Sequence, residues 1–370
     1  MRKQEGRSVT IFGGAGFIGS NLAHSLLATT AAKVHVFDNF SRAGVHHNVE
    51  WLRRTAGNSG RLQVTVGDVR DARQVESAVQ HATEIYQLAA QVAVTTSVTD
   101  PRLDFEVNLA GTFNVLDAAR RCGNAPFIVF TSTNKVYGDL GLGAPVANKS
   151  RYYVPGHQGT SESQPLDFHS PYGCSKGAAD QYVRDFARIY GLPAVVLRLS
   201  CVAGPRQFGT EDQGWLAHFV YSALQGQPVV IYGDGRQVRD VLAVEDLVRA
   251  LAAVREHLPV TRAGIYNVGG GAENTTSLLE LIDELERLTG RRLEHMHRER
   301  RVGDQPIYIT DNSKIARDAG WRPMIALRTT IQLLCKFWEE NHGAISVRRR
   351  AAAPGVASFA LASELSGRAG

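Results

Sequence analysis

A short apolar segment runs directly into a glycine-rich loop near the start of the chain, and this pairing constrains the fold more than any other feature. Ser8–Phe12 has the composition of a buried strand, and Gly13, Gly16 and Gly19 follow it with the spacing G-x-x-G-x-x-G. Such a loop turns tightly and brings a helix N-terminus, with its unpaired N–H groups, toward a phosphate. The pattern therefore predicts a βα unit that binds the pyrophosphate of a dinucleotide.

Strand and helix patterns alternate through the first half of the chain. Short apolar runs without polar alternation are typical of strands that are buried on both faces. Alternating β and α units favour an α/β fold, and we expect a Rossmann-type doubly wound parallel sheet. Further strands are expected at Val34–Phe37, Leu62–Val66, Ile85–Ala89 and Phe127–Phe130, and helices at Phe17–Ala28, Arg102–Arg121 and Tyr172–Tyr190.

The character of the chain changes after Leu197. We expect residues 1–197 to form mainly the dinucleotide-binding domain and residues 198–343 mainly a smaller C-terminal α/β lobe for the substrate, with the chain crossing between lobes. Residues 344–370 are rich in Arg, Ala, Gly and Ser, which predicts a disordered tail. The pieces of the smaller lobe are expected to be the strands Val229–Tyr232 and Ile265–Val268 and the helices Ala243–Glu256 and Ser277–Thr289.

Composition excludes several classes of partner. The four scattered cysteines form no C-x-x-C pair, so we expect no metal site and no disulfides, which favours the reducing cytoplasm. No secretory signal core and no membrane-spanning apolar run is recognised, so no membrane partner is expected. The net charge is +5, but the basic clusters at residues 291–301 and 348–350 lack interleaved aromatic residues. They indicate a solvated surface and no nucleic-acid partner.

Acidic residues follow the second and third predicted strands. Asp38 ends the second strand, where a carboxylate accepts the two hydroxyls of the adenosine ribose and repels a 2′-phosphate. This favours NAD over NADP, although Arg42 lies only four residues further on. Asp68 and Val69 follow the third strand and are expected near the adenine amino group.

Candidate catalytic groups lie at a strand end and in a helix. Tyr172 and Lys176 are four residues apart, so they share one face of the predicted helix. A neighbouring ammonium group and a cationic nicotinamide ring would both favour the phenolate, so Tyr172 is a candidate base. Thr131 and Thr133 follow the strand Phe127–Phe130, and a hydroxyl there is placed to hydrogen-bond a reacting sugar oxygen.

These residues together resemble the extended short-chain dehydrogenase/reductases. The resemblance extends from about Val9 to Pro323, nearly the whole ordered chain. The resemblance implies a Thr–Tyr–Lys catalytic triad, which would be Thr133, Tyr172 and Lys176. The motifs that carry it are the glycine loop, Leu88-Ala89-Ala90, Thr133 before Val136-Tyr137-Gly138, and the Tyr172/Lys176 pair.

Longer stretches resemble one branch of that family, the CDP-tyvelose (CDP-paratose) 2-epimerases. The branch implies hydride removal and return at C2 of a nucleotide-linked sugar, through a 2-keto intermediate. The matching stretches are Ser132–Gly138, Phe168–Tyr182, Arg206-Gln207-Phe208, Asp212-Gln213-Gly214-Trp215 and Gln237-Val238-Arg239-Asp240-Val241.

The resemblance also implies which residues contact ligands, and it implies a homodimer or homotetramer built on the helices Arg102–Arg121 and Tyr172–Tyr190. The implied NAD contacts are Gly13, Gly16, Phe17, Ile18, Gly19, Asp38, Asn39, Ser41, Arg42, Asp68, Val69, Leu88, Ala89, Ala90, Gln91, Asn108, Thr131, Tyr172, Lys176 and Ser200. The implied contacts to the nucleotide-sugar substrate are Gln91, Thr133, Asn134, Lys135, Arg206, Gln207, Arg239 and Arg301, with the arginines suited to phosphate oxygens.

The reaction class depends on the two residues after Thr133. The 4,6-dehydratases of the family carry an Asp-Glu pair there, because eliminating water needs an acid and a base, and this chain has Asn134 and Lys135. Epimerisation needs no such pair, so it is favoured, although Asp139 or Glu162 could replace the missing carboxylates. A 4-epimerase, a dehydratase, a decarboxylase and a non-catalytic NAD-binding regulator remain alternatives.

Some positions depart from the family pattern. Cys201 stands where many relatives have Asn, and Ala203 where many have Tyr. The segment 144–164 matches least, and we expect this long loop to shape the sugar pocket. These departures leave the sugar and the nucleotide base open.

Overall fold

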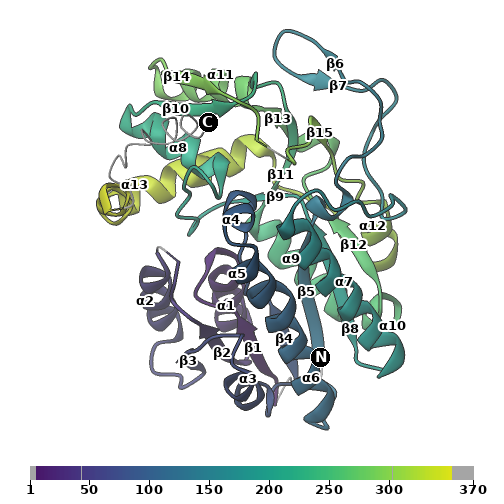
Figure 1. Ribbon diagram of the computed structural model, residues 1–370. Helices are drawn as coiled ribbons and strands as arrows, with labels where there is room; N and C mark the ends of the chain where they lie inside the picture. The colour runs from purple at the N-terminus through teal and green to yellow at the C-terminus, as the bar shows by residue number, and fades with distance from the viewer. Residues whose placement is uncertain (1–5, 43, 302, 352–370) are drawn as a thin grey trace, which may run out of the picture.

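The computed structural model describes residues 6–42, 44–301 and 303–351, with residues 344–351 given by their backbone alone. Seven parallel strands form the sheet of the larger lobe, in the order β12-β8-β5-β4-β1-β2-β3 (Figure 1). The strands are β1 (Ser8–Phe12), β2 (Lys33–Asp38), β3 (Leu62–Val66), β4 (Glu84–Gln87), β5 (Phe127–Thr133), β8 (Ala194–Leu199) and β12 (Ile265–Val268).

Helices cover both faces of this sheet. Apolar side chains of α1, α2, α9 and α12 form one buried cluster with the strands, and those of α3, α6 and α7 form another on the opposite face. This arrangement confirms the predicted Rossmann-type doubly wound sheet. The helices are α1 (Phe17–Thr29), α2 (Val45–Ala56), α3 (Ala72–Val79), α6 (Gly111–Arg121), α7 (Pro171–Ile189), α9 (Val244–Glu256) and α12 (Ser313–Ala319).

The strand order reverses between β1 and β4, and this reversal determines where a ligand can bind. In doubly wound sheets, ligands bind beside the carboxyl ends of the strands at such a switch point. Gly13 and Leu88 follow β1 and β4, while Asp38 and Thr133 end β2 and β5. The predicted site residues therefore lie along one edge of the sheet.

A smaller lobe lies beyond this edge, at the top of Figure 1. Strand β11 pairs with β9, β13 and β15, and β10 pairs with β14. Helices α8, α11 and α13 pack on these strands around a third apolar cluster. The elements are β9 (Cys201–Ala203), α8 (Trp215–Gln225), β10 (Val229–Tyr232), β11 (Val238–Ala243), β13 (Thr275–Ser277), α11 (Leu278–Thr289), β14 (His295–Arg298), β15 (Ile307–Tyr308) and α13 (Leu327–Ala351).

Two elements expected in the smaller lobe belong to the larger one. Strand β12 pairs in parallel with β8, with Ile265 opposite Val196. Leu247 and Leu251 of α9 are buried in the same apolar cluster as the β1 residue Val9. The expectation was wrong for these elements because the pattern of a short apolar run does not say which sheet it joins.

Several short helical elements lie between the main helices and strands. Helices α4 and α5 lead through a π-helical turn, η1, into α6, and together they cover the segment predicted as one helix from Arg102 to Arg121. The short elements are α4 (Val94–Thr99), α5 (Pro101–Phe105), η1 (Glu106–Ala110), α10 (Leu258–Thr261) and the 3-10 turns η2 (Asn134–Tyr137) and η3 (Ala272–Asn274).

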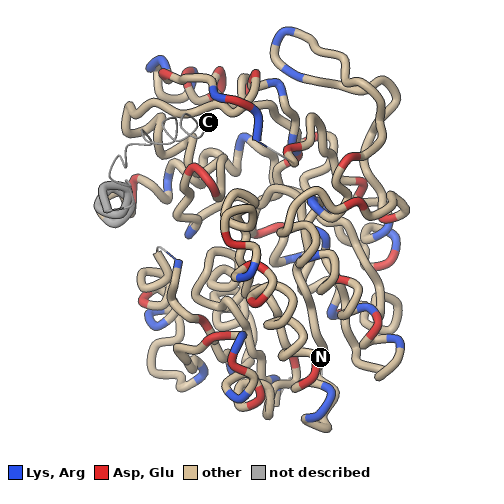
Figure 2. The backbone as a smooth tube through the Cα atoms, in the orientation of Figure 1, with Lys and Arg blue, Asp and Glu red and all other residues tan. Residues whose placement is uncertain are grey.

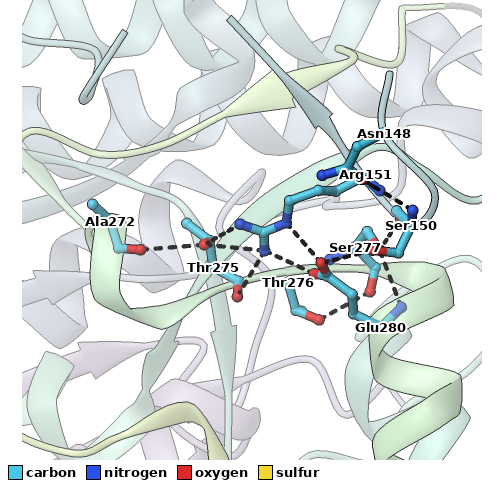
Figure 3. A network of polar contacts seen from close by, with 8 residues as sticks. All are labelled: Asn148, Ser150, Arg151, Ala272, Thr275, Thr276, Ser277 and Glu280. Atoms are coloured by element: carbon cyan, nitrogen blue, oxygen red, sulfur yellow. Dashed lines mark hydrogen bonds and ion pairs between the residues drawn. The ribbon is translucent and has the colours of Figure 1, made fainter. Parts of the chain in front are cut away.

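The long loop forms a hairpin, β6 (Val146–Ala147) with β7 (Tyr152–Tyr153), that projects from the smaller lobe in Figure 1. The Arg151 guanidinium donates two hydrogen bonds to the Glu280 carboxylate, of 2.8 and 2.7 Å (Figure 3). Glu280 also completes a capping box with Ser277 at the start of α11. One carboxylate thus holds both the start of α11 and the turn of the hairpin, between β6 and β7.

The C-terminal segment differs in part from its prediction. Helix α13 extends to Ala351, so the first residues of the predicted tail are helical, and residues 352–370 lie outside the described part. Among the described residues, none of the helices has the length and apolarity to cross a bilayer, and none of the His, Cys, Asp and Glu side chains cluster as a metal site. Acidic and basic residues are interspersed over both lobes (Figure 2).

Candidate active site

The glycine loop leaves space for a phosphate only because two of its positions lack a side chain. Gly13 has a φ of +76°, and a Cβ atom there would lie 2.8 Å from the backbone nitrogen of Ala89. A Cβ atom at Gly19 would lie 2.3 Å from the carbonyl oxygen of Gly13. Any larger residue at either position would push the loop away from β4 or from α1.

The start of α1 offers hydrogen-bond donors to an anion. Gly16 is the N-cap residue and supplies no side-chain cap. The N–H groups of Phe17 and Ile18, in the first turn, have no intrahelical acceptor and lie at the positive end of the helix dipole. These features fit the pyrophosphate of NAD.

Asp38 is held firmly beside this loop. Its carboxylate accepts hydrogen bonds from the N–H groups of Ala15, at 3.1 Å, and Phe40, at 2.9 Å. Burial raises the pKa of Asp38, while these donors and Arg42 act in the opposite direction. The carboxylate is thereby fixed at the end of β2, where a ribose would bind.

The predicted adenine contacts lie on the next strand end. The Asp68 carboxylate pairs with Arg70 at 2.8 Å and hydrogen-bonds the Asn39 side chain, and Arg70 lowers the pKa of Asp68. Val69 is buried, and Ser41 is exposed. The side chains of Asn39 and Asp68 therefore lie next to each other beside Asp38.

Arg42 connects the two lobes across the cofactor edge. Its guanidinium hydrogen-bonds the side chain of Gln213, which belongs to the smaller lobe. Leu88, Ala89 and Ala90 follow β4 directly, with the Leu88 N–H bonded to the carbonyl of Phe12 at 3.0 Å. These contacts place the segment after β4 against the glycine loop.

Gln91 and Asn108 have a different environment from the one predicted. The side chain of Gln91 donates to the carbonyl of Ala93 at 2.8 Å and to Asp104 at 3.0 Å, and that of Asn108 donates to the Gln91 carbonyl at 2.9 Å. Both side chains are buried in this polar network, which braces the floor of the site. Their amide groups are committed to protein partners, so the structure does not bring Gln91 to the substrate.

Thr131 and Ser200 also lie deep in the sheet edge. The Thr131 hydroxyl donates to the Gln87 carbonyl at 3.5 Å, and the Ser200 hydroxyl donates to the Asp240 carbonyl at 3.3 Å. Both positions end strands of the central sheet or follow them, which is why the sequence placed them near the cofactor.

Thr133, Tyr172 and Lys176 form what we call the catalytic floor. Thr133 ends β5, and its side chain hydrogen-bonds that of Tyr172, in the first turn of α7. Lys176 lies one turn further on, with its ammonium group over the Phe130 ring at 4.1 Å from the centroid. All three residues are at least nine-tenths buried.

Burial dominates the ionisation of the floor. It raises the pKa of Tyr172 to about 12, with the Thr133 hydrogen bond acting in the opposite direction, and it lowers the pKa of Lys176 to about 7. A lowered tyrosine pKa was expected from the lysine ammonium and the cationic nicotinamide together. The protein by itself thus keeps the phenol protonated, and a further positive charge is needed to favour the phenolate.

A cavity of about 560 Å³ opens above the floor, between the two lobes. Thr133, Asn134, Lys135 and Tyr172 line it from the larger lobe, and Arg239 and Arg301 from the smaller one. The structure therefore brings together most of the predicted substrate residues. Further lining residues include Val94, Thr95, Glu211, Asp212, Trp215, Tyr232 and Asp304.

The far side of this cavity carries paired charges, which we call the ionic wall: Lys135, Asp212, Arg239, Arg301 and Asp304. Asp304 accepts from Arg239 at 2.6 Å and from Lys135 at 3.4 Å, and these two cations hold the pKa of Asp304 at about 2 against the effect of burial. Arg301 pairs with Asp212 at 3.3 Å. The wall thus has three cations and two carboxylates, an arrangement suited to a substrate with two negative charges.

Arg206 and Gln207 were predicted to bind substrate, and the structure places both elsewhere. The Arg206 guanidinium lies over the rings of Trp51, at 4.3 Å, and Phe337, at 5.2 Å. The Gln207 amide donates to the Val202 carbonyl at 3.1 Å. Neither residue lines the cavity, because the turn after β9 directs both away from it.

The long loop also differs from its expected role. Pro145 and Val154 line a second cavity of about 420 Å³ beside the first, together with Asp139 and His169. Glu162 accepts a hydrogen bond from the Asn267 N–H at 2.7 Å and does not line the first cavity. The two carboxylates that could have replaced the dehydratase pair are therefore not beside Tyr172.

Comparison with known proteins identifies the family. A family model described as GDP-mannose 4,6 dehydratase matches residues 10–334. The chain belongs to this family. It is an extended short-chain dehydrogenase/reductase, as its motifs indicate, and like its relatives it is an NAD-dependent enzyme.

Members of the family with different reactions are similar to this chain over most of its length. A CDP-paratose 2-epimerase of Salmonella typhi is 40% identical over 330 residues, covering 87% of this chain and 96% of that protein. A dTDP-glucose 4,6-dehydratase of Salmonella typhimurium is 32% identical over 352 residues, covering 90% and 93%. The UDP-glucose 4-epimerase of Thermus thermophilus, solved with NAD, has a TM-score of 0.74 at 32% identity, covering 90% and 99%.

The sequence did not assign roles to several residues that the structure brings to this family member's cavity. Asp304 pairs with Arg239, and the Arg301 guanidinium lies over the Tyr232 ring. Trp215 also lines the cavity. A signal was present for Trp215, because it lies in a stretch that resembles those of relatives. What the sequence did not contain was the pairing of Asp304 with two cations from distant segments.

Proposed function

We propose that the enzyme epimerises C2 of a CDP-linked deoxysugar through a 2-keto intermediate. The observation that carries the proposal is the composition of the cavity next to Tyr172: Asn134 and Lys135 take the places of the dehydratase carboxylates. Asn134 donates a hydrogen bond to Gln305 at 3.3 Å, and Lys135 is paired with Asp304. The 40% identity to a CDP-paratose 2-epimerase supports the same choice.

The floor would handle the proton in this reaction. Tyr172 takes the proton from the sugar hydroxyl and later returns it, while Thr133 orients the reacting oxygen through its hydroxyl. Lys176 holds the nicotinamide ribose and supplies positive charge below the phenol. Bound NAD would supply reversible hydride transfer at the sugar carbon that carries this hydroxyl.

The wall would hold the nucleotide diphosphate. The pyrophosphate replaces Asp304 as the partner of Arg239 and Lys135, and Arg301 forms the second half of the clamp. The exchange keeps both cations paired before and after binding. The Asp304 carboxylate that it releases has a quarter of its side-chain surface exposed and can be solvated. The sugar then projects toward Tyr172, and the division of roles between residues 1–197 and 198–343 is part of the proposal.

A substrate panel in deuterium oxide tests the function. The purified enzyme is incubated with CDP-, UDP-, GDP- and dTDP-sugars, and products are followed by NMR while NADH is followed by absorbance. An isomer of equal mass, changed at C2, without solvent deuterium and without net NADH, is expected. Loss of water or carbon dioxide, a change at C4, or stoichiometric NADH would assign a different reaction, and no conversion at all would favour a regulatory NAD-binding protein.

We also propose that two copies associate through α6 and α7, in the cytoplasm. The aromatic side chains Phe113, Tyr182 and Tyr190 are exposed and make edge-to-face or tilted ring contacts with Phe186. An exposed aromatic cluster of this kind is typical of a surface covered by a partner. Light scattering after gel filtration is expected to give twice the chain mass, and Phe113→Glu is expected to halve it.

A further inference from the structure

Asp104, in α5, is a buried carboxylate that no catalytic role yet explains. Its side chain is fully buried, and it accepts hydrogen bonds from Gln91 at 3.0 Å, from Asn108 at 3.0 Å and from the Ser175 hydroxyl. All three partners are neutral. A buried carboxylate normally pairs with a cation. Asp104 has no cation among its hydrogen-bond partners, and the cation that acts on it through space is Lys176.

The hydrogen bond to Ser175 connects Asp104 to the catalytic floor. Ser175 lies in α7 between Tyr172 and Lys176, and its hydroxyl also accepts from Asn108 at 3.1 Å. The Ser175 hydroxyl has two acceptors within reach, Asp104 and, at 3.2 Å, the carbonyl of Tyr172. Its contacts with Asp104 and Asn108 hold the first turns of α7 against α5 and η1. The position of the Tyr172 ring therefore depends on this contact.

The charge of Asp104 acts on the floor as well. Within the described residues, Lys176 has no hydrogen-bond partner, and the carboxylates that interact with it are Asp104 and Asp180. Asp180 is already neutralised, because Arg198 donates to it at 2.7 Å. Asp104 is thus the unneutralised negative charge that favours the ammonium form of Lys176.

We propose that Asp104 is a positioning residue that fixes the start of α7 through Ser175 and keeps the proton on Lys176. The proposal rests on the roles proposed above for Tyr172 and Lys176. It extends the active site to a carboxylate that does not line the cavity.

The pH dependence follows from the signs. Asp104 raises the pKa of both Lys176 and Tyr172, because a nearby negative charge favours the ammonium and disfavours the phenolate. The other groups that face the floor are Thr133 and Arg42, beside Tyr172, and the Asp180–Arg198 pair, beside Lys176. Removing the charge of Asp104 leaves these groups in place and lowers both pKa values.

The test compares Asp104→Asn with wild-type holoenzyme by the pH profile of kcat. The variant keeps the side-chain shape, and both limbs of the profile are expected to move to lower pH by about one unit. Asp100→Asn is the matched control, since Asp100 is an exposed carboxylate that caps α5 through the Leu103 N–H at 3.0 Å, and its profile is expected to match wild type. Limbs that stay in place in Asp104→Asn would overturn the proposal.

Ser175→Ala separates the positioning role from the charge. It removes the hydroxyl but leaves the carboxylate, so kcat is expected to fall about tenfold without movement of either limb. Wild-type kcat in this variant would contradict the positioning role, even if Asp104→Asn failed to fold.

A titration without turnover distinguishes this inference from the proposed function. The phenolate of Tyr172 is read by ultraviolet difference absorbance of the NAD-loaded protein, with Tyr172→Phe as the reference. Asp104→Asn is expected to lower this titration midpoint, and an unchanged midpoint would refute the inference. A wild-type enzyme that converts no nucleotide sugar would instead contradict only the proposed function.

Discussion

The catalytic floor and the ionic wall face each other across one cavity, yet their charges are controlled by opposite means. On the floor, burial shifts the pKa values of Tyr172 and Lys176 toward their neutral forms. On the wall, pairing prevails over burial and holds Asp304 ionised. The contrast concerns Asp304 and not every group of the wall, because burial also lowers the pKa of Lys135. Asp304 differs because it pairs with two cations.

This difference matches two chemical tasks. A group that must gain and lose a proton works best with its pKa near the working pH. Burial brings the pKa of Lys176 there, while Tyr172 still needs a further positive charge to lower its pKa. A group that must hold a fixed anion is best kept charged, which ion pairs achieve. Substitutions that remove a group of the floor or a group of the wall should therefore have different effects, and a substitution outside both should leave catalysis unchanged.

Tyr172→Phe removes the proton carrier of the floor and should have the largest effect. We expect kcat to fall by about 10²–10⁴-fold, because general acid–base catalysis contributes that much. Bound NAD should be unchanged, since the glycine loop and Asp38 are intact, and the NAD content of the purified protein measures this. Tyr153→Phe, on the exposed hairpin, is the control and should retain wild-type kcat.

Lys176→Met tests whether burial of the Lys176 ammonium group destabilises the folded protein. The folded pKa of about 7 lies below the ordinary 10.5, so the cost of burying the ammonium is fully present below about pH 7 and disappears as the pH rises toward 10.5. The cofactor-stripped variant should therefore exceed wild type in unfolding free energy at pH 6.5, by a few kcal/mol on the order expected for such shifts.

The gain in Lys176→Met should shrink in urea titrations at pH 9, and turnover should be lost at both pH values. A variant that is less stable than wild type at pH 6.5 would show that the lysine is stabilised by pairing, like the wall.

Arg239→Gln removes one cation of the wall. We expect KM for the nucleotide sugar to rise by roughly 10–100-fold, since a hydrogen bond to a charged group contributes about 1.5–3 kcal/mol. The effect on kcat should be small because the floor is untouched. Arg236→Gln is the matched control, as Arg236 pairs with Asp234 outside the cavity, and an equal rise in KM there would argue against a specific phosphate contact.

Arg206→Met should have the smallest effect on activity, because Arg206 does not line the cavity. KM should stay at the wild-type value, while the unfolding free energy should fall by about 1–2 kcal/mol through loss of the two ring contacts. Steady-state kinetics and urea denaturation measure the two. A tenfold rise in KM would restore the role expected from the sequence.

The floor and the cofactor loop were predictable because their geometry is local. Gly13, Gly16 and Gly19 belong to one turn, and Tyr172 and Lys176 share one helical face, so spacing alone indicates that each set lies together. Thr133 joins the floor from the end of β5, a distant segment. The doubly wound parallel sheet followed from the alternation of strand and helix patterns. The family resemblance then identified the same residues by their order along the chain.

The wall was predicted only in part because its contacts join distant segments. Arg239 and Asp304 are 65 residues apart, and nothing in either segment indicates that they meet. Arg206 lies in a stretch that matches relatives, but the match does not say which way the side chain points. Asp104 was missed because a single acid in a helical pattern looks like an exposed residue until its burial is known.

Strand β12 lies far after its neighbour β8 in the chain, and this separation matters while the chain is being synthesised. Strand β8 pairs with β5 on one side and with β12 on the other, and Ile265–Val268 follows more than 60 residues after β8, as the numbering shows. While a ribosome makes the intervening segment, β8 is an open sheet edge, with unpaired N–H and C=O groups available to another chain. Aggregation of nascent molecules should therefore be most severe in fragments truncated between β8 and β12, and should fall once Val268 has emerged.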